Sequence, residues 1–151
     1  LYEYAQTDQL QEQVPFWQKI TSQEEEGSPF QTPALFNIEE HAEILSIQLT
    51  KDQTDILLRQ ASQAYRTEVN DLLLSGLTQA VGKPLLITLE GHGREDLFEQ
   101  MDLSRTVGWF TSSYPIFIPF IQTDIERQIK DVKETLRAVP QKGIGYGLLQ
   151  Y

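Results

Sequence analysis

Four ionisable side chains follow a short apolar segment in the middle of the chain. Residues 90–95 read EGHGRE and come directly after the apolar residues 85–89. The glycines on either side of His92 leave the backbone free to turn sharply, and the carboxyl end of a strand is where α/β folds place ligands. Glu90 shares a strand face with two residues of the apolar segment, so we expect its carboxylate to be drawn inward and partly desolvated. A general acid or base that works near neutral pH needs such surroundings.

The expected position of Arg94 decides between several interpretations. A cation next to Glu90 would favour the ionised carboxylate, whereas a pair with Glu95 or Asp96, or a contact with substrate, would leave Glu90 unaffected. A strand-to-loop exit with a surface salt bridge also explains residues 90–95, and composition alone favours it. The segment therefore offers Glu90 and Arg94 as catalytic candidates, to be weighed against a solvated turn.

Three further segments do not have the pattern of simple packing. Residues 104–111 (SRTVGWFT) suit a core strand with an aromatic anchor, in which Gly108 marks a bulge or a close approach to the backbone. Residues 140–147 (PQKGIGYG) have a glycine spacing similar to a dinucleotide fingerprint, but we expect no helix after them and therefore predict a constrained loop. Residues 70–74 (NDLLL) predict a helix start with a polar first turn and a core face.

Other catalytic chemistries lack the residues they need. His41 and His92 are far apart and do not have metal-ligand spacing, so we expect no metal site. The sequence has no phosphate-binding Gly-Lys-Ser/Thr loop and no Gly-x-Ser-x-Gly turn for a serine nucleophile. It also has no cysteine, which removes disulfides and thiolate chemistry and suits the cytoplasm.

The elements that must position these segments follow an α/β pattern. Leu45, Ile47 and Leu49 alternate with polar residues and predict a strand with one buried face, and a capping box at Thr50 starts a helix directly after it. The next expected elements are a helix capped by Thr67, a strand at 85–89 buried on both faces, and a strand over 106–120 that is interrupted or turned at Pro115. A last helix is expected to begin with a capping box at 123–126 and to end before Pro140. Its inward face would consist of Ile125, Ile129, Val132 and Leu136. This order predicts an α/β fold with a mixed sheet flanked by helices.

The N-terminal part and the overall composition set further bounds. Apolar residues at helical spacing over 7–20 predict a helix that Pro15 kinks or ends, and the acidic, proline-containing stretch 21–36 predicts a solvated connection. The length of 151 residues fits one domain, and the net charge of −10 argues against a nucleic-acid surface. The sequence shows no membrane-helix or signal-peptide pattern. Because it starts at Leu1 without methionine, we expect a piece of a longer protein.

The four segments together resemble core motifs of the condensation-type domains of nonribosomal peptide synthetases. They are residues 70–74, 90–95, 105–115 and 140–147, and in this order and spacing they look most like the C-terminal half of an epimerization domain. The resemblance covers nearly the whole chain. It implies the C-terminal lobe of a two-lobed fold like that of chloramphenicol acetyltransferase, with the active site in a channel between the lobes.

The resemblance also implies a division of the chain and a substrate. Residues 1–36 would be a leading helix and linker, and residues 37–151 would be the C-terminal lobe, incomplete without its N-terminal lobe. The substrate would be an aminoacyl or peptidyl thioester on the phosphopantetheine arm of a carrier protein, with no cofactor bound directly. The reaction would convert the L form to the D form by removal and return of the Cα proton.

Residue roles follow from the same resemblance. Glu90 would be the acid–base candidate of this lobe, and Arg94 would orient groups or balance charge. The remaining residues expected in the motifs or along the substrate channel are His92, Asn70, Asp71, Arg105, Trp109, Thr111, Tyr114, Gly145 and Tyr146.

Two motifs of the family are missing from this sequence. The first is the His-His-x-x-x-Asp-Gly motif of the N-terminal lobe, whose second histidine acts opposite the glutamate in the family. The second is a Phe-Asn-Tyr motif expected shortly after Tyr151. We therefore expect this chain to have no epimerase activity alone. Its expected partners are the missing N-terminal lobe, a peptidyl carrier protein and adjacent synthetase domains in the cytoplasm.

Two other functions stay open at this point. Condensation relatives share the fold and form amide bonds between two carrier-bound substrates, although residues 90–95 and 105–111 match the epimerization pattern better. The chain could also be a non-catalytic lobe that docks a carrier protein. Lys130, Lys133 and Arg137 would matter for such docking, but the solvated face of an amphipathic helix explains them more simply.

Overall fold

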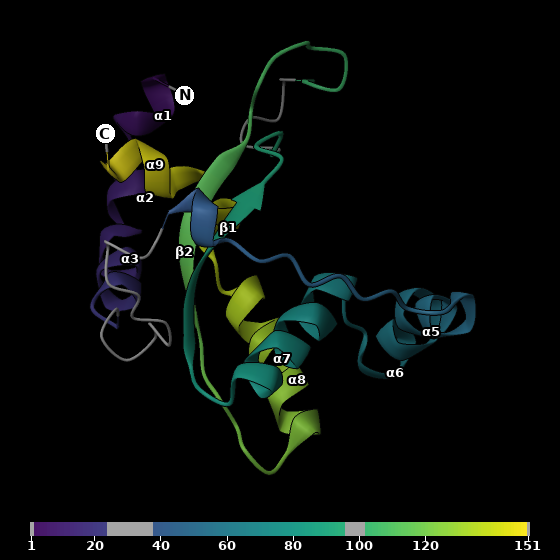
Figure 1. The fold of residues 1–151 in the computed structure, drawn as a ribbon. Coiled ribbons are helices and arrows are strands. Elements are labelled where there is room, and N and C mark those ends of the chain that lie inside the picture. Colours follow the sequence, from purple (N-terminus) through teal and green to yellow (C-terminus); the bar gives the residue numbers. More distant parts are fainter. Residues whose placement is uncertain (1, 24–37, 96–101, 151) are drawn as a thin grey trace.

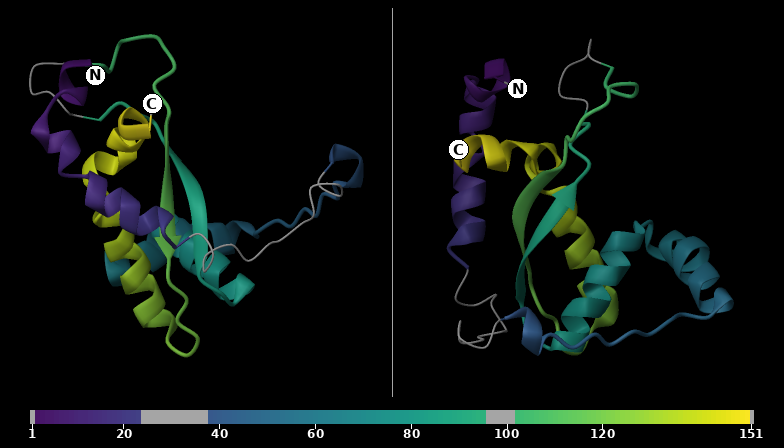
Figure 2. Two further views of the ribbon diagram at one scale, coloured as in Figure 1. Left: turned by 90° about the vertical axis from the view of Figure 1, so that its left-hand side faces the viewer. Right: turned by 45° about the horizontal axis from the view of Figure 1, so that its top comes forward.

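The computed structural model describes residues 2–23, 38–95 and 102–150. Its centre is a two-stranded antiparallel sheet with helices along it, as Figures 1 and 2 show. The α/β class predicted from the sequence is confirmed, but the sheet within these ranges is antiparallel rather than mixed because the first expected strand does not pair. Most of the predicted connection 21–36 lies outside the described residues. No helix within them is long and apolar enough to cross a membrane.

Strand β1 (Leu85–Gly91) pairs with strand β2 (Ser112–Ile118) along its whole length. The predicted strand over 106–120 is thus shorter than expected. Pro115 lies within β2, opposite Thr88, and does not turn the strand as the sequence suggested. Each strand of a two-stranded sheet has an open side, and a proline's missing N–H is tolerated there.

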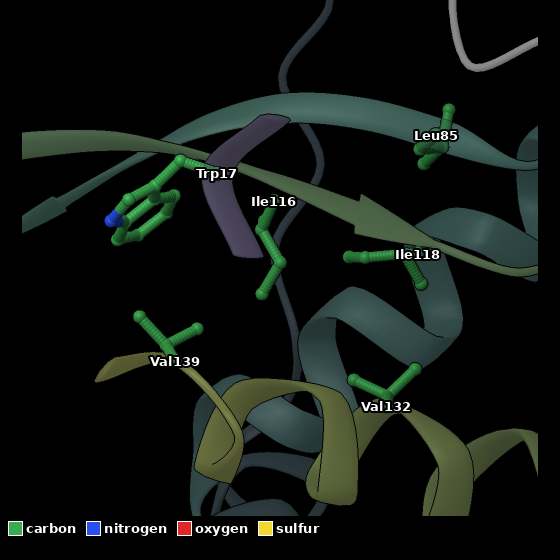
Figure 3. Close-up of a cluster of buried hydrophobic side chains, with 6 residues drawn as sticks. All are labelled: Trp17, Leu85, Ile116, Ile118, Val132 and Val139. Atoms are coloured by element: carbon green, nitrogen blue, oxygen red, sulfur yellow. The ribbon is translucent and has the colours of Figure 1, made fainter. Parts of the chain in front are cut away.

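The hydrophobic core covers one face of this hairpin. The core cluster consists of Trp17, Leu85, Ile116, Ile118, Val132 and Val139 (Figure 3). Leu85 is 2% exposed, whereas Thr88 and Glu90 on the other face of β1 are exposed. The prediction that this strand is buried on both faces is wrong, because the described residues cover only one of them.

Helix α7 (Val69–Val81) precedes β1 and packs against helix α8. It begins where residues 70–74 predicted a polar first turn, so that part of the prediction is confirmed. The predicted core face differs, because Leu73 is 52% exposed and the buried residues of the helix are Asp71, Ser75 and Thr78. The cap residue is Glu68 rather than Thr67, because the N–H of Glu68 donates to Oδ2 of Asp71 at 2.8 Å. The Asp71 carboxylate thereby satisfies an amide at the helix start.

Helix α8 (Ile125–Arg137) follows β2 and ends before Pro140, as predicted. Its cap is Asp124, whose Oδ1 accepts a hydrogen bond from the N–H of Arg127 at 2.9 Å, one residue later than the sequence suggested. Val132 is completely buried against the hairpin, but Ile125 is 55% exposed. The inward face of the helix therefore starts after Ile125, not at it.

Three short helices form the N-terminal part: α1 (Tyr2–Ala5), α2 (Asp8–Gln11) and α3 (Val14–Thr21). They lie beside helix α9, and α3 also contacts β2 (Figures 1 and 2). Pro15 is in the first turn of α3, where a helix needs no N–H donor. The expected single helix is therefore divided just before Pro15.

The C-terminal segment is helical. A short 3-10 helix η4 (Pro140–Gly143) leads into α9 (Ile144–Gln150). The predicted constrained loop over 140–147 is wrong for its second half, because Ile144 and Gly145 are buried and continue into a helix.

Residues 42–50 follow a 3-10 turn, η2 (Glu39–His41), and run as an extended trace without joining the sheet (Figure 1). Ile44 and Leu45 are 92% exposed and Ile47 is 87% exposed. The predicted strand with a buried face is wrong here. Alternation makes a strand only where another strand pairs with it, and none of the described residues does so.

A capping box at Thr50 starts the next helical segment, as predicted. Oγ1 of Thr50 accepts from the N–H of Gln53 at 3.2 Å, and Oε1 of Gln53 accepts from the N–H of Thr50 at 2.9 Å. Helix α5 (Lys51–Asp55), a π-helical segment η3 (Ile56–Ala61) and helix α6 (Ser62–Tyr65) follow one another. This segment extends away from the hairpin (Figures 1 and 2).

Candidate active site

Glu90 lies near the end of β1, opposite Ser113 of β2. Its side chain shares the exposed face of the hairpin with Thr88. The expected inward, desolvated carboxylate is therefore not found, because no described residue covers this face. An exposed carboxylate at a strand end is open to a ligand that approaches from outside the chain.

The loop after β1 turns sharply at Gly93, as the two glycines predicted. Gly93 has a φ of +65°, and a Cβ atom on it would overlap the carbonyl oxygen of Phe110 and lie 2.6 Å from the carbonyl carbon. Glycine alone tolerates both the left-handed backbone and this approach. The loop therefore passes directly against the backbone of Phe110.

Arg94 anchors the segment that follows the loop. Its guanidinium donates to the carbonyl oxygen of Leu103 at 2.6 Å and lies 4.3 Å from the centroid of the Phe110 ring, a cation–π geometry. Its backbone N–H donates to Nδ1 of His92 at 3.0 Å. Asp96, one of the carboxylates that the sequence offered as a partner, lies outside the described residues.

Glu95 contacts Lys142 and His92 rather than Arg94. Oε2 of Glu95 is 3.0 Å from Nζ of Lys142, and its Oε1 is 3.4 Å from Nε2 of His92. The Glu95 side chain is only 11% exposed. Among the described residues, Arg94 forms no ion pair with Glu95 or with Glu90, so two of the sequence-based alternatives for Arg94 do not occur.

Sequence reasoning missed Lys142. Gln141 and Lys142 have left-handed φ values of 44° and 50°, and Gly143 follows with a φ of 85°. Residues with a Cβ rarely adopt this conformation, so composition gave no reason to expect it. The only signal was Gly143 itself, which suggests a turn but not the direction of the preceding side chain.

Tyr114 lies next to this turn. A Cβ atom on Gly143 would overlap the Tyr114 ring, so the turn packs directly against it. Burial raises the pKa of the Tyr114 phenol, the charge of Glu95 raises it further, and Lys142 partly opposes this rise. Tyr114 is thus the predicted motif residue that the structure places beside Glu95 and Lys142.

The segment before β2 differs from its predicted form. Residues 104–111 do not form a core strand, since Trp109 is 91% exposed and Arg105 and Thr111 are also exposed. Gly108 lies close to a neighbouring side chain, because a Cβ on it would be 3.0 Å from the Phe110 ring. The aromatic anchor of this segment is therefore Phe110, which Arg94 covers, and not Trp109.

Gly145 and Tyr146 belong to the packing between α9 and the N-terminal helices. A Cβ on Gly145 would overlap Oε1 of Gln13 and lie 2.9 Å from Cδ1 of Leu10. The rings of Tyr146 and Trp17 have centroids 5.1 Å apart. Both residues are accounted for by this contact between helices.

Asn70 and Asp71 lie in the first turn of α7, which packs mainly on α8. Asp71 is 5% exposed and its carboxylate caps the helix, whereas Asn70 is exposed. Their positions give α7 its start. They are not part of the group formed by the loop after β1.

One group of the predicted residues comes together at the end of the hairpin. It consists of His92, Arg94 and Tyr114, with Glu95 and Lys142 added by the structure. Glu90 lies at the same end of the hairpin but on its other face, since Tyr114 is opposite Leu89 and Glu90 is opposite Ser113. In the part of the chain that the structure describes, no three His, Asp or Glu side chains are close enough to hold a metal ion. This end of the hairpin thus offers carboxylates, a phenol and cations, which suit acid–base chemistry.

Comparison with known proteins identifies relatives over the whole chain. The family model of the condensation domain matches residues 1–151. Two synthases of Bacillus licheniformis are among the relatives: bacitracin synthase 2 is 41% identical over 100% of this chain, and bacitracin synthase 3 is 46% identical over 98% of it. The chain spans 6% and 2% of these two synthases, respectively.

A solved structure has the same fold. The crystal structure of the epimerization domain from the third module of tyrocidine synthetase B matches with a TM-score of 0.82 and 40% sequence identity. The match covers 98% of this chain and 35% of that one, so the chain spans about a third of the solved domain. The fold is accordingly the α/β fold of condensation and epimerization domains, which resembles chloramphenicol acetyltransferase. The chain belongs to the condensation-domain family of the nonribosomal peptide synthetases.

Proposed function

We propose that this chain is part of an epimerization domain, which inverts the Cα of an aminoacyl or peptidyl thioester from L to D. The substrate would be carried on the phosphopantetheine of a carrier protein. The observation that carries the proposal is the similarity to a solved epimerization domain over 98% of the chain. The exposed carboxylate of Glu90 at the end of β1 supports it.

The reaction sets requirements that this chain meets in part. Resonance of the thioester acidifies the α proton, so the enzyme needs a base on one face of Cα, an acid on the other and stabilisation of the enolate-like intermediate. Glu90 would remove or return the proton on one face. Arg94 is held on Leu103 and Phe110 and would act by fixing the segment beside Glu90. The acid or base for the opposite face would come from the N-terminal lobe.

The division of the domain follows from this proposal. Residues 37–151 would form the C-terminal lobe, and residues 1–36 would lead into it, with α3 packed on β2. The carrier protein, the N-terminal lobe and adjacent synthetase domains would be its partners. Because only one side of a two-sided proton transfer is present, this chain alone would not exchange the Cα proton.

Substitution of Glu90 tests the catalytic assignment in the complete domain. Glu90→Gln keeps the shape of the side chain but removes the base, so exchange of the Cα proton with deuterated solvent should fall about 10²–10⁴-fold. Glu134→Gln is the matched control, since this carboxylate is exposed on α8 and pairs with Arg137 at 3.6 Å. Wild-type exchange by Glu90→Gln would move the role to another residue, and deuterium incorporation by the 151-residue chain alone would refute the need for a second lobe.

A second function, amide-bond formation between two carrier-bound substrates, is favoured by the match to the condensation-domain model. The two functions differ in product. A complete domain supplied with one loaded carrier should exchange the Cα proton if it is an epimerase. A condensation domain should need two loaded carriers and leave a dipeptidyl thioester on the acceptor carrier, with the donor carrier set free as its thiol. Chiral analysis of the hydrolysed products separates the two.

A non-catalytic carrier-docking lobe is the third possibility. Three basic residues of α8 would serve carrier docking, and two of them also hold the end of α6. Lys133 donates to the carbonyl oxygen of Tyr65 at 2.9 Å, and Arg137 donates to the carbonyl oxygen of Arg66 at 3.2 Å. Their packing function makes them poor candidates for a free docking surface. Carrier binding by the complete domain without any proton exchange would favour this third function.

A further inference from the structure

Lys142 joins the 140–143 turn to the loop after β1. Its Nζ is 3.0 Å from Oε2 of Glu95, the last described residue of this part of the chain. The backbone of the turn lies near the end of β1, since a Cβ built on Gly91 would be 3.8 Å from the carbonyl oxygen of Lys142. The turn therefore lies beside the end of β1 that carries Glu90, and the Lys142 side chain links it to the segment that follows.

The turn that presents Lys142 has a costly backbone. Gln141 and Lys142 both have left-handed φ and ψ angles, near 44° and 38° for the first and 50° and 33° for the second. Consecutive residues with a Cβ avoid this conformation, and it persists only where the surroundings determine it. Here Gly143 fixes the turn against Tyr114, and the side chain of Lys142 fixes it to Glu95.

The Glu95 carboxylate depends on Lys142 for its ion pair. The side chain is 11% exposed, so its carboxylate has little water to replace a lost partner. The other groups that face it are His92, at 3.4 Å, and the Tyr114 phenol. Nδ1 of His92 accepts the N–H of Arg94, and its Nε2 is the ring atom near Glu95. Without Lys142, only His92 and the Tyr114 phenol of these groups would face the carboxylate.

We propose that Lys142 is a positioning residue for Glu90: by its ion pair with Glu95 it fixes the segment that follows Glu90 to the 140–143 turn, and so holds the end of β1 that carries Glu90 in place. This inference rests on the proposed function, since it assigns the supporting structure of the same acid–base group. Lys142 itself touches no substrate atom in this scheme. Glu95 is the second member of the link.

Substitution of Lys142 in the complete domain tests the inference. Lys142→Met removes the charge, and we expect kcat for Cα proton exchange to fall about 10–100-fold with an unchanged KM for the loaded carrier, as for a displaced catalytic group. Lys142→Arg keeps a cation and should restore most of the rate. Lys83→Met is the matched control, because Lys83 is exposed in the turn before β1 and should leave kcat unchanged. A wild-type kcat for Lys142→Met, or equal damage in Lys142→Met and Lys142→Arg, would overturn the inference.

The link can also be measured without the reaction. Loss of the Lys142 charge should raise the pKa of Tyr114, and Glu95→Gln should lower this pKa. Phenolate absorbance measures the titration of Tyr114 when the absorbance of the same variant carrying Tyr114→Phe is subtracted. Unchanged titration in both variants would overturn the link. If Tyr114 responds but Glu90→Gln retains exchange, the link stands and the proposed function fails. If Glu90→Gln abolishes exchange and Lys142→Met does not affect it, the proposed function stands and the positioning fails.

Discussion

The ring of Tyr114 fills the space that a side chain at position 143 would need. Gly143 has a φ of +85°, and a Cβ on it would overlap the ring. This contact ties the 140–143 turn to β2, so the turn depends on glycine for its backbone and for its packing.

Gly143→Ala should therefore destabilise the chain strongly. A left-handed alanine and an overpacked ring together cost about 2–4 kcal/mol. Gly76→Ala is the matched control, since Gly76 lies within α7 with no atom near its Cβ position, and it should stabilise the chain by about 0.5–1 kcal/mol. Urea unfolding of the two variants measures both effects. Similar free energies of unfolding for the two variants would contradict the geometry at residue 143.

Gly145→Ala should separate the N-terminal helices from α9. The new methyl group would overlap Gln13 and press on Leu10, at a cost of about 1–3 kcal/mol. Trp17 lies at the same contact, so its fluorescence should change together with the free energy of unfolding. Gly147→Ala on the same helix has open space, so it should leave the fluorescence unchanged and, as a helical Gly→Ala change, stabilise the chain by about 0.5–1 kcal/mol. Equal effects of the two substitutions would remove Gly145 from this contact.

Local signals in the sequence predicted several elements correctly. The capping box at Thr50, the start of α7 and the hydrophobic strand at 85–89 each depend on residues a few positions apart. The strand expected at Leu45 failed because pairing is a property of two segments, and alternation in one of them cannot supply the other.

The candidate site could be predicted only in part for the same reason. The sharp turn at Gly93 follows from local composition, whereas the pairing of Glu95 with Lys142 joins residues far apart in the chain. The pattern of residues 104–111 predicts a core strand with an aromatic anchor, but no described segment covers Trp109, which is 91% exposed. Side-chain burial depends on the elements that pack around a segment, which its own composition does not specify.

Truncation of two isoleucines should distinguish the covered and uncovered parts of the chain. Ile116 is 1% exposed in the core, and Ile116→Ala should cost about 2–5 kcal/mol in the free energy of unfolding. Ile47 is 87% exposed, and Ile47→Ala should change it by less than about 0.5 kcal/mol. Chemical denaturation of the 151-residue chain measures both. A large loss for Ile47→Ala would mean that residues 42–50 are packed in solution.

Tyr114 should make the chain less stable in alkali. Its folded-state pKa is raised by burial and by Glu95 above the ordinary tyrosine value of 10.0. A raised pKa means that the folded state binds the proton more tightly than the unfolded state does. The stability that this raised pKa contributes is complete below the pKa of the unfolded state and is lost as the pH rises through the pKa of the folded state. Above about pH 10, the wild-type chain should lose more stability than Tyr114→Phe, as followed by urea unfolding at each pH. Parallel pH curves for the two proteins would contradict a raised pKa.

The extended segment 42–50 also governs how concentrated solutions of this chain behave. Among the described residues, no backbone group pairs with its amides and carbonyls in a ladder, and Ile44, Leu45 and Ile47 stand out from it into solvent. Such an edge is a template on which another extended chain adds by hydrogen bonding. Self-association should therefore rise with protein concentration, and a lysine in place of Ile47 should suppress it by placing a charge at the growing edge.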